Sequence, residues 1–240
     1  GKYAGLKTEE SNPVILADLK ESGALFASEE IVHSYPHCWR CKKPIIFRAT
    51  PQWFCSVDSF KDEAIAACED VRWVPSWGRD RMRSMILERT DWCISRQLWW
   101  GHQIPAWYCG DCGETVVAKE APCTCPKCGS SNMTQDPDTL DTWFSSQLWT
   151  FATQGWPQKP ELLEGHHPTT ALVTARDIIA LWVARMVMSS LYFLDEVPFK
   201  DVVIYPTILA KDGSRMSKSK GNGVDPMDLI GMYGADAMRY

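Results

Sequence analysis

The cysteines constrain the fold of this chain more than any other feature, because six of the ten occur as Cys-x2-Cys pairs. Each pair forms a tight knuckle that points two thiolates at one position, and two knuckles complete a tetrahedral site of four sulfurs. Cys109 and Cys112 are followed, after twelve residues, by Cys125 and Cys128. We predict that these four residues hold one zinc ion, in a closed and therefore structural site.

The other cysteines leave alternatives open. Cys123 is too close to Cys125 to form a knuckle with it. Cys38 and Cys41 supply only two ligands, so they are either core thiols or half of a second zinc site whose other knuckle lies upstream of this sequence. For the four-sulfur cluster, the alternative is a set of buried free cysteines.

The overall charge excludes a general nucleic-acid coat. The 240 residues carry a formal net charge of -5 with a pI near 5.6, so any contact with nucleic acid must be local. No secretory signal pattern is present, which favours metal binding over disulfides and a cytoplasmic location. The longest apolar run, residues 178–194, is interrupted by Arg185, and we expect a buried helix there.

The order of the expected elements indicates an α/β fold. Residues 169–175 are typical of a short buried strand and lead directly into the apolar helix. Residues 199–213 begin as a second strand and end in a turn at Asp212, before a loop and a further helix. Strand, helix, strand, loop and helix are the pattern of the second half of a nucleotide-binding fold.

Capping residues predict where other helices begin. Helices are expected over residues 12–23, 59–69 and 79–90. Asn12 is the expected N-cap of the first, and Ser59 and Asp62 have the spacing of a capping box. Asp225 followed by Pro226 predicts the start of the last helix.

Four cations lie within ten residues near the end of the sequence, namely Lys211, Arg215, Lys218 and Lys220. The stretch from Arg215 to Asn222 is RMSKSKGN, in which small residues separate the cations. Such a loop after a strand can close over phosphates, because cations stabilise charge on phosphorus and small residues let main-chain N–H groups approach oxygen. A solvated surface loop is the alternative.

Several segments, in order along the chain, resemble the class I aminoacyl-tRNA synthetases. RMSKS is similar to the KMSKS signature of that family, and the others are SYPHCWRC, PQWF, DWCISRQLWWGHQIPAWYC, LDTWFSSQLW, DIIALWVARM and FKDVVIY. From Leu98 onward the segments favour the valyl enzymes, whereas the first third is closer to the isoleucyl enzymes, which are the alternative. The resemblance implies the second half of a Rossmann-type parallel-sheet catalytic domain with a zinc-ribbon insertion.

The resemblance also implies a domain division. Residues 1–50 correspond to the return limb of the inserted editing region, and residues 51–240 to the C-terminal half of the catalytic domain. The second part includes the zinc insert at 109–128 and the signature loop at 215–219. No HIGH-like signature is found, so we expect this internal piece to be inactive alone. We also expect the full-length enzyme to be a monomer.

Individual residues receive roles from the resemblance. In the family the signature loop steadies the ATP phosphates, which implies catalytic roles for Lys218, Arg215, Ser217 and Ser219. The family's amino-acid pocket corresponds here to Trp143, Ile178 and Trp182. The last two are four residues apart and would share one helix face, although ordinary core residues are the alternative.

Thr174 and Asp177 have capping-box spacing, and the resemblance adds contact with the adenylate near that helix start. The family usually has Val-Thr-Gly-Phe-Asp here, whereas this chain has VTARD. Ala175 in place of glycine puts a close approach of the adenosine to the backbone in doubt.

The resemblance implies ATP with magnesium, valine and tRNA as partners, and zinc as the structural metal. It implies binding to neither membranes nor DNA. A competing hypothesis is a zinc-containing tRNA-binding module without catalysis. An enclosed aliphatic pocket would separate the two, because an RNA-binding module has no use for one. A stable structural piece without activity in isolation is compatible with the enzyme hypothesis.

Overall fold

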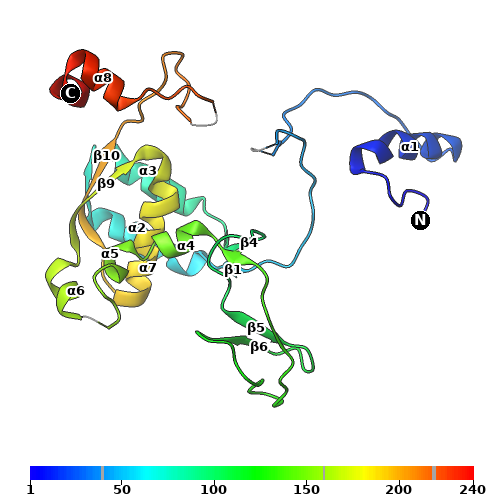
Figure 1. The fold of residues 1–240 in the computed structure, drawn as a ribbon, viewed down its shortest axis with the longest axis horizontal. Coiled ribbons are helices and arrows are strands. Elements are labelled where there is room, and N and C mark those ends of the chain that lie inside the picture. Colours follow the sequence, from blue (N-terminus) through cyan, green and yellow to red (C-terminus); the bar gives the residue numbers. More distant parts are fainter. Residues whose placement is uncertain (39–40, 159, 218–219) are drawn as a thin grey trace. The chain divides into compact units, whose positions relative to one another are not determined.

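The computed structural model describes residues 1–38, 41–158, 160–217 and 220–240 (Figure 1). The chain divides into two compact units, Gly1–Pro51 and Gln52–Tyr240. Each unit is described by itself below.

The first unit contains helix α1, Thr8–Glu21, followed by extended chain. The expected start at Asn12 is wrong, because the helix begins four residues earlier and Pro13 lies inside it. Glu9 and Glu10 in the first turn favour this earlier start through the helix dipole, and a Glu10 carboxylate oxygen accepts the Lys7 main-chain N–H at 3.4 Å.

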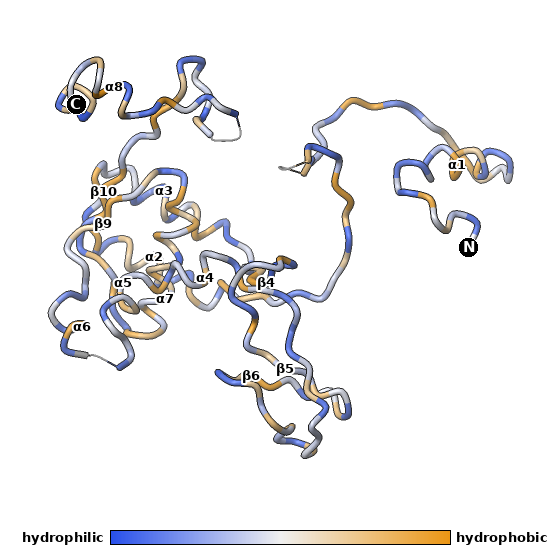
Figure 2. Tube along the Cα trace, in the orientation of Figure 1, coloured by the Kyte–Doolittle hydropathy of each residue, from blue (hydrophilic) through white to orange (hydrophobic). Residues whose placement is uncertain are grey.

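The second unit is built on a parallel sheet of three strands, which confirms the expected α/β class. The strands are β2 (Arg72–Val74), β10 (Phe199–Tyr205) and β9 (Thr169–Ala175), with β10 in the centre. Hydrophobic residues run along β9 and β10 in Figure 2, and Val202 and Ile204 of β10 are buried. Parallel strands place all their carboxyl ends at one side of the sheet.

The connection from β9 to β10 begins irregularly and not as the single α-helix expected. Residues Arg176–Ile178 form a 3₁₀ turn, Ile179–Val183 a π-helix, and only Ala184–Leu194 (α7) is α-helical. No side chain caps this segment; Thr174 belongs to β9 and is 1% exposed, so its hydroxyl is inside the fold and cannot cap.

Helix α7 is a core helix. Seven successive residues, Ala184–Ser190, are buried, including Arg185. In the described chain, the stretch Arg176–Leu194 alone is long and apolar enough to cross a membrane by length and composition, but half of it is buried inside the fold. A core helix passes the same test.

Two helices lie with the sheet and α7 around the main core (Figure 1). They are α2 (Lys61–Asp70), preceded by the 3₁₀ turn Asp58–Phe60, and α3 (Trp77–Leu87). The capping box expected from Ser59 and Asp62 is wrong, because the residue before α2 is Phe60 and the 3₁₀ turn takes its place. Buried Met82 and Ile86 of α3 join the core.

Short elements connect this core to a small antiparallel sheet. β1 (Phe54–Cys55) pairs with β3 (Trp92–Cys93), and β4 (Ser95–Arg96) pairs with β8 (Thr139–Leu140). The small sheet consists of β5 (Ala106–Cys109), β6 (Thr115–Val117) and β7 (Met133–Gln135), with β5 in the centre. We call residues 106–135, which carry the two cysteine knuckles, the cysteine ribbon.

The remaining helices are α4 (Thr142–Ser146), α5 (Trp149–Ala152), α6 (Pro160–His166), α8 (Pro226–Tyr233) and α9 (Ala235–Arg239). The predicted start of α8 is confirmed, because the Asp225 side chain accepts the Met227 main-chain N–H at 2.9 Å and Pro226 occupies the first turn.

Candidate functional site

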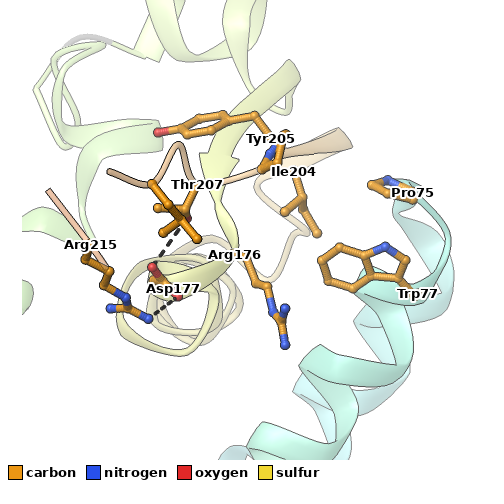
Figure 3. Close-up of a pocket in the computed structure, with 10 residues that line it drawn as sticks. Pro75, Trp77, Arg176, Asp177, Ile204, Tyr205, Thr207 and Arg215 are labelled. Carbon is orange, nitrogen blue, oxygen red and sulfur yellow. Dashed lines mark hydrogen bonds and ion pairs between the residues drawn. The ribbon is translucent and has the colours of Figure 1, made fainter. Parts of the chain in front are cut away.

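A pocket of about 500 Å³ lies at the carboxyl ends of the three parallel strands (Figure 3). We call it the strand-end pocket. Its wall comes from the residues that directly follow β2, β9 and β10, and from Arg215 of the loop beyond β10. The lining residues are Pro75, Trp77, Arg176, Asp177, Ile204, Tyr205, Pro206, Thr207, Leu209 and Arg215. Ligands of open α/β sheets bind at this side of the sheet.

Asp177 and Arg215 meet in this pocket. The Arg215 guanidinium donates to Asp177 Oδ1 at 2.9 Å, and the Thr207 hydroxyl donates to Oδ2 at 3.4 Å (Figure 3). Arg215 is largely exposed, so water weakens this ion pair. Arg215 of the RMSKS stretch is therefore held next to Asp177, the expected adenylate residue. Breaking this contact costs little free energy.

The 206–224 loop is organised by Asn222. The Asn222 side chain accepts the Ser217 main-chain N–H at 2.9 Å and donates to the Ser214 hydroxyl and the Arg215 carbonyl oxygen at 3.0 and 3.1 Å. Asp212 accepts from the Ser214 hydroxyl and N–H, and these hydrogen bonds hold the pKa of Asp212 below its usual range. Lys218 and Ser219, also expected catalytic residues, lie outside the described residues.

Eight of the ten lining residues were missed by the sequence reasoning, and four of these have polar or aromatic side chains, namely Trp77, Arg176, Tyr205 and Thr207. The Arg176 guanidinium carbon lies 6.0 Å from the centre of the Trp77 ring. Trp77, Arg176 and Thr207 follow a strand end within three residues, and Tyr205 is the last residue of β10. Figure 3 shows that the four come from three separate elements. That position is the signal that could have found them, although β2 is too short to be recognised by its pattern.

The residues expected to line the amino-acid pocket lie elsewhere. The Trp182 indole N–H donates to the Ser146 carbonyl oxygen at 2.9 Å, which docks the π-helix on α4. Trp143 and Trp182 are half-buried and pack against the main core, and Ile178 ends the 3₁₀ turn. The prediction that Ile178 and Trp182 share one face of an α-helix is wrong, because that turn and the π-helix replace it.

Thr174 does not reach the strand-end pocket. Among the described residues, its buried hydroxyl oxygen has no hydrogen-bond partner. The structure thus separates Thr174 from Asp177, which the sequence had paired by spacing.

The four sulfur atoms of Cys109, Cys112, Cys125 and Cys128 all lie within 4.8 Å of one another. The Cys109–Cys128 and Cys112–Cys125 pairs are 3.5 and 3.6 Å apart. Tetrahedral Zn–S bonds of about 2.3 Å require sulfurs about 3.8 Å apart. Cys123 is exposed and outside this group.

The main chain builds both knuckles in the same way. Gly113 N–H donates to Cys109 O at 2.9 Å, and Gly129 N–H donates to Cys125 O at 2.8 Å. Both glycines have φ near +74°, which a side chain would strain (Gly113 at 73°, Gly129 at 75°). The two glycines therefore allow the tight turn that each knuckle needs.

The electrostatics of the four thiols fit a cation. Main-chain N–H groups of Cys112 and Asp111 lower the pKa of Cys109 to about 7. The Ser130 N–H also favours the Cys128 thiolate, but the sulfurs of Cys112 and Cys109 outweigh it and raise the pKa of Cys128 to about 12. Four thiolates this close repel each other, and a divalent cation removes that repulsion.

Cys38 and Cys41 form a third knuckle with the same main-chain pattern. Lys42 N–H donates to Cys38 O at 2.9 Å, and Cys38 N–H donates to Lys43 O at 2.8 Å. Lys42 has φ 61°, the conformation of the glycines in the other knuckles. In the described part of the chain, the one group of three or more side chains placed to hold a metal is that of the ribbon cysteines, and it does not include Cys38 or Cys41.

Comparison with known families places nearly the whole chain. The model for tRNA synthetases class I (I, L, M and V) matches residues 6–240. The chain is 49% identical over its whole length to the valine–tRNA ligase of Carboxydothermus hydrogenoformans and 48% identical to that of Thermotoga maritima. It spans about 28% of the length of each.

Solved structures share the fold. A Mycobacterium tuberculosis methionyl-tRNA synthetase in complex with methionyl-adenylate has a TM-score of 0.56 at 21% identity, covering 88% of this chain and 36% of that one. An Agrobacterium radiobacter K84 LeuRS in a ternary complex with tRNA and LeuAMS has a TM-score of 0.51 at 24% identity, over 62% and 23%.

Proposed function

Since the chain belongs to the class I tRNA synthetases, we propose that the protein of which it is a part activates valine with ATP and transfers the valyl group to tRNA(Val). The observation that carries this proposal is the strand-end pocket, where Arg215 of the signature loop meets Asp177. The similarity to valine–tRNA ligases covers the first third as well, which favours valine over the isoleucine alternative.

The loop supplies positive charge to the phosphates in this proposal. Arg215 leaves Asp177 when ATP with its magnesium enters, and together with Lys218 it stabilises the negative charge that develops on the α-phosphorus. Ser217 and Ser219 donate to phosphate oxygens. Asp177, once released, accepts a hydrogen bond from the adenylate near β9.

Valine specificity is assigned to Trp143, Ile178 and Trp182. Support comes from the hydrogen bond from Trp182 to Ser146, which holds the π-helix against α4, the helix that carries Trp143. Such a pocket discriminates only modestly between side chains that differ by one methylene. Aminoacyl-tRNA synthetases therefore add an editing step.

Zinc is proposed as the structural metal of the cysteine ribbon. Cys109, Cys112, Cys125 and Cys128 would hold it, and it would fix the two knuckles against each other. The matching geometry of Cys38 and Cys41 supports a second half-site, completed by a knuckle elsewhere in the intact protein.

The same proposal covers the domain division, the cellular location and the oligomeric state. Residues 1–50 are assigned to the return limb of the editing insertion and 51–240 to the catalytic half, and the division after Pro51 supports this boundary. The intact protein is proposed to be a cytoplasmic monomer that binds neither membranes nor DNA.

Pyrophosphate exchange tests the function. The intact protein should exchange pyrophosphate into ATP in the presence of valine, and Arg215→Ala should lower kcat at least tenfold, because a transition-state charge contact is lost. The 240-residue chain alone should show no exchange, and valine-dependent exchange by it would refute that expectation. Isoleucine-dependent exchange, or tRNA binding by the intact protein without any exchange, would favour the alternatives.

A further inference from the structure

A second hollow, of about 510 Å³, lies where the end of α3 meets β3, β4 and the π-helix. It contains three arginines, and we call it the arginine hollow. The lining residues are Met85, Glu88, Arg89, Thr90, Asp91, Trp92, Cys93, Arg96, Ala180 and Arg185. It shares no lining residue with the strand-end pocket.

Arg185 is the most deeply placed of the three. It is 5% exposed, and its guanidinium carbon lies 3.9 Å from the centre of the Trp92 ring. One terminal nitrogen donates to the Leu181 carbonyl oxygen at 2.7 Å, whereas Nε is buried without a partner among the described residues. Burial, and then the charge of Arg89, lower the pKa of Arg185 to about 10. A buried guanidinium with an unused donor is costly unless an anion compensates it.

The other two arginines add positive charge beside it, and Asp141, the partner of Arg96, offsets the charge of Arg185 only in part. Arg89 is half-buried and donates to the Ala180 carbonyl oxygen at 2.6 Å. Arg96 pairs with Asp141 at 3.0 Å and is 37% exposed. In the part of the chain that the structure describes, this is the one ion pair that the three arginines make.

Two acidic residues also line the hollow, and neither neutralises the arginines. Asp91 accepts the Val57 main-chain N–H at 3.2 Å, and Glu88 is exposed. No ion pair joins either residue to the three arginines among the described residues. The interior of the hollow is therefore positive, and its exposed rim carries the negative groups.

From this arrangement we infer that the arginine hollow binds a backbone phosphate of RNA. Guanidinium groups match phosphate oxygens in geometry and charge. The exposed rim at Glu88 and Asp91 leaves the hollow open to a polymer, and Arg185 covers the Trp92 ring, so no base can stack on it. The contact is then sequence-independent and positions the RNA. The inference takes its RNA, tRNA, from the proposed function.

Arg89 offers a clean pair of variants. Arg89→Gln removes the charge but keeps a donor for the Ala180 carbonyl oxygen, whereas Arg89→Lys keeps the charge. The control is Arg83→Gln in α3, six residues earlier, because Arg83 is exposed, pairs with Glu69 at 3.2 Å and lies outside the hollow. Thermal melts check that each of the three variants still folds.

The measurement is the affinity of the 240-residue chain for a tRNA transcript as a function of salt. Arg89→Gln should weaken binding about tenfold and lower the salt slope by about 0.7–0.9, the value for one lost phosphate contact. Arg83→Gln should change affinity less than about twofold, and Arg89→Lys should fall between them. Equal affinities and slopes for Arg89→Gln and Arg83→Gln, or no binding by the wild-type chain, would overturn the inference.

A competition arm separates RNA phosphate from free phosphate. Millimolar inorganic phosphate at constant ionic strength should leave the bound transcript in place; if it displaces the transcript from the wild type but not from Arg89→Gln, the hollow is a free-anion site and the RNA assignment is wrong. Valine-dependent pyrophosphate exchange by the intact protein reports the proposed function separately. If exchange persists while Arg89→Gln binds RNA normally, the assignment of the arginine hollow is wrong but the proposed function is not.

Discussion

The cysteine ribbon and the 206–224 loop both lie outside the main core, yet they are held in opposite ways. In the ribbon, four sulfurs converge within 4.8 Å and glycines with positive φ close both knuckles. In the loop, the exposed Arg215–Asp177 ion pair and the side chain of Asn222 are the main ties. The ribbon suits a fixed scaffold, whereas the loop suits an element that must exchange one partner for another.

In these two regions, which lack long strands, rigidity comes from different sources. Metal ligation concentrates the stabilisation in a few atoms, so the ribbon needs little core. Exposed ion pairs contribute about 0–1 kcal/mol each, so the loop can open at small cost.

Removing one ribbon sulfur should have the largest effect. Cys109→Ser should reduce bound zinc from about one equivalent per chain to none, because three ligands no longer close the site. Elemental analysis after purification without added metal measures this. The matched control is Cys123→Ser, which lies outside the cluster and should keep its zinc. Equal zinc in the two variants would contradict the assignment, and a second equivalent in the wild type would show that Cys38 and Cys41 find ligands.

Crowding the floor of the strand-end pocket should come next. A Cβ at Gly78 would lie 2.5 Å from Ile204 Cδ1 and 2.8 Å from Trp73 Cε3. Gly78→Ala should therefore destabilise the second unit by about 1–3 kcal/mol, as overpacking does. Denaturant unfolding measures this. Gly165→Ala in α6 is the control, since a Cβ there meets nothing within 4 Å; an equal loss in both would show that the close packing of α3 is not the cause.

The joint between the ribbon and the body is the next test. Asp136 is 5% exposed and accepts from Trp53 Nε1 at 2.8 Å and the Tyr108 hydroxyl at 2.6 Å. Burial alone would raise its pKa, but these hydrogen bonds and the Asp138 N–H outweigh burial and hold the pKa below its usual range. Asp136→Asn should cost about 1–2 kcal/mol of stability near neutral pH.

The pH dependence of that joint follows from the lowered pKa. The stabilisation is present above the unfolded-state pKa of about 3.9 and is lost as the pH falls through the lower folded-state pKa. The difference in stability between wild type and Asp136→Asn should therefore be constant near neutral pH and shrink below about pH 4. A difference independent of pH down to acid unfolding would show that the charge of Asp136 is not involved.

Loosening the loop should have the smallest effect on stability. Asn222→Ala removes three hydrogen bonds, yet the loop adds little to the core, so the melting temperature should hardly change. Limited proteolysis should cut the 206–224 loop several-fold faster. Gly223→Ala is the control, because a Cβ there meets nothing within 4 Å. If both variants were cut at the wild-type rate, Asn222 would not be the organiser of the loop.

The elements that could be predicted from the sequence are those with local causes. The ribbon cysteines, the Asp225 cap and strands β9 and β10 follow from spacing, capping chemistry and runs of apolar residues. The first turns after β9 could not be predicted this way. Ile178 and Trp182 fit an α-helix by spacing, but packing against α4 and the hydrogen bond to Ser146 hold a π-helix there.

The sequence alone determined the four-sulfur cluster, the parallel α/β class and the signature loop, because each depends on residues close together in the chain or on a repeating pattern. Packing between distant elements, in contrast, brings Trp77, Arg176 and Tyr205 into one pocket with Arg215. It also brings Arg89, Arg96 and Arg185 into one hollow. Those residues come from separate elements, and the pairing of β2 with β10 and the packing of α3 on the sheet bring them together. Such long-range packing leaves no periodic trace in the sequence.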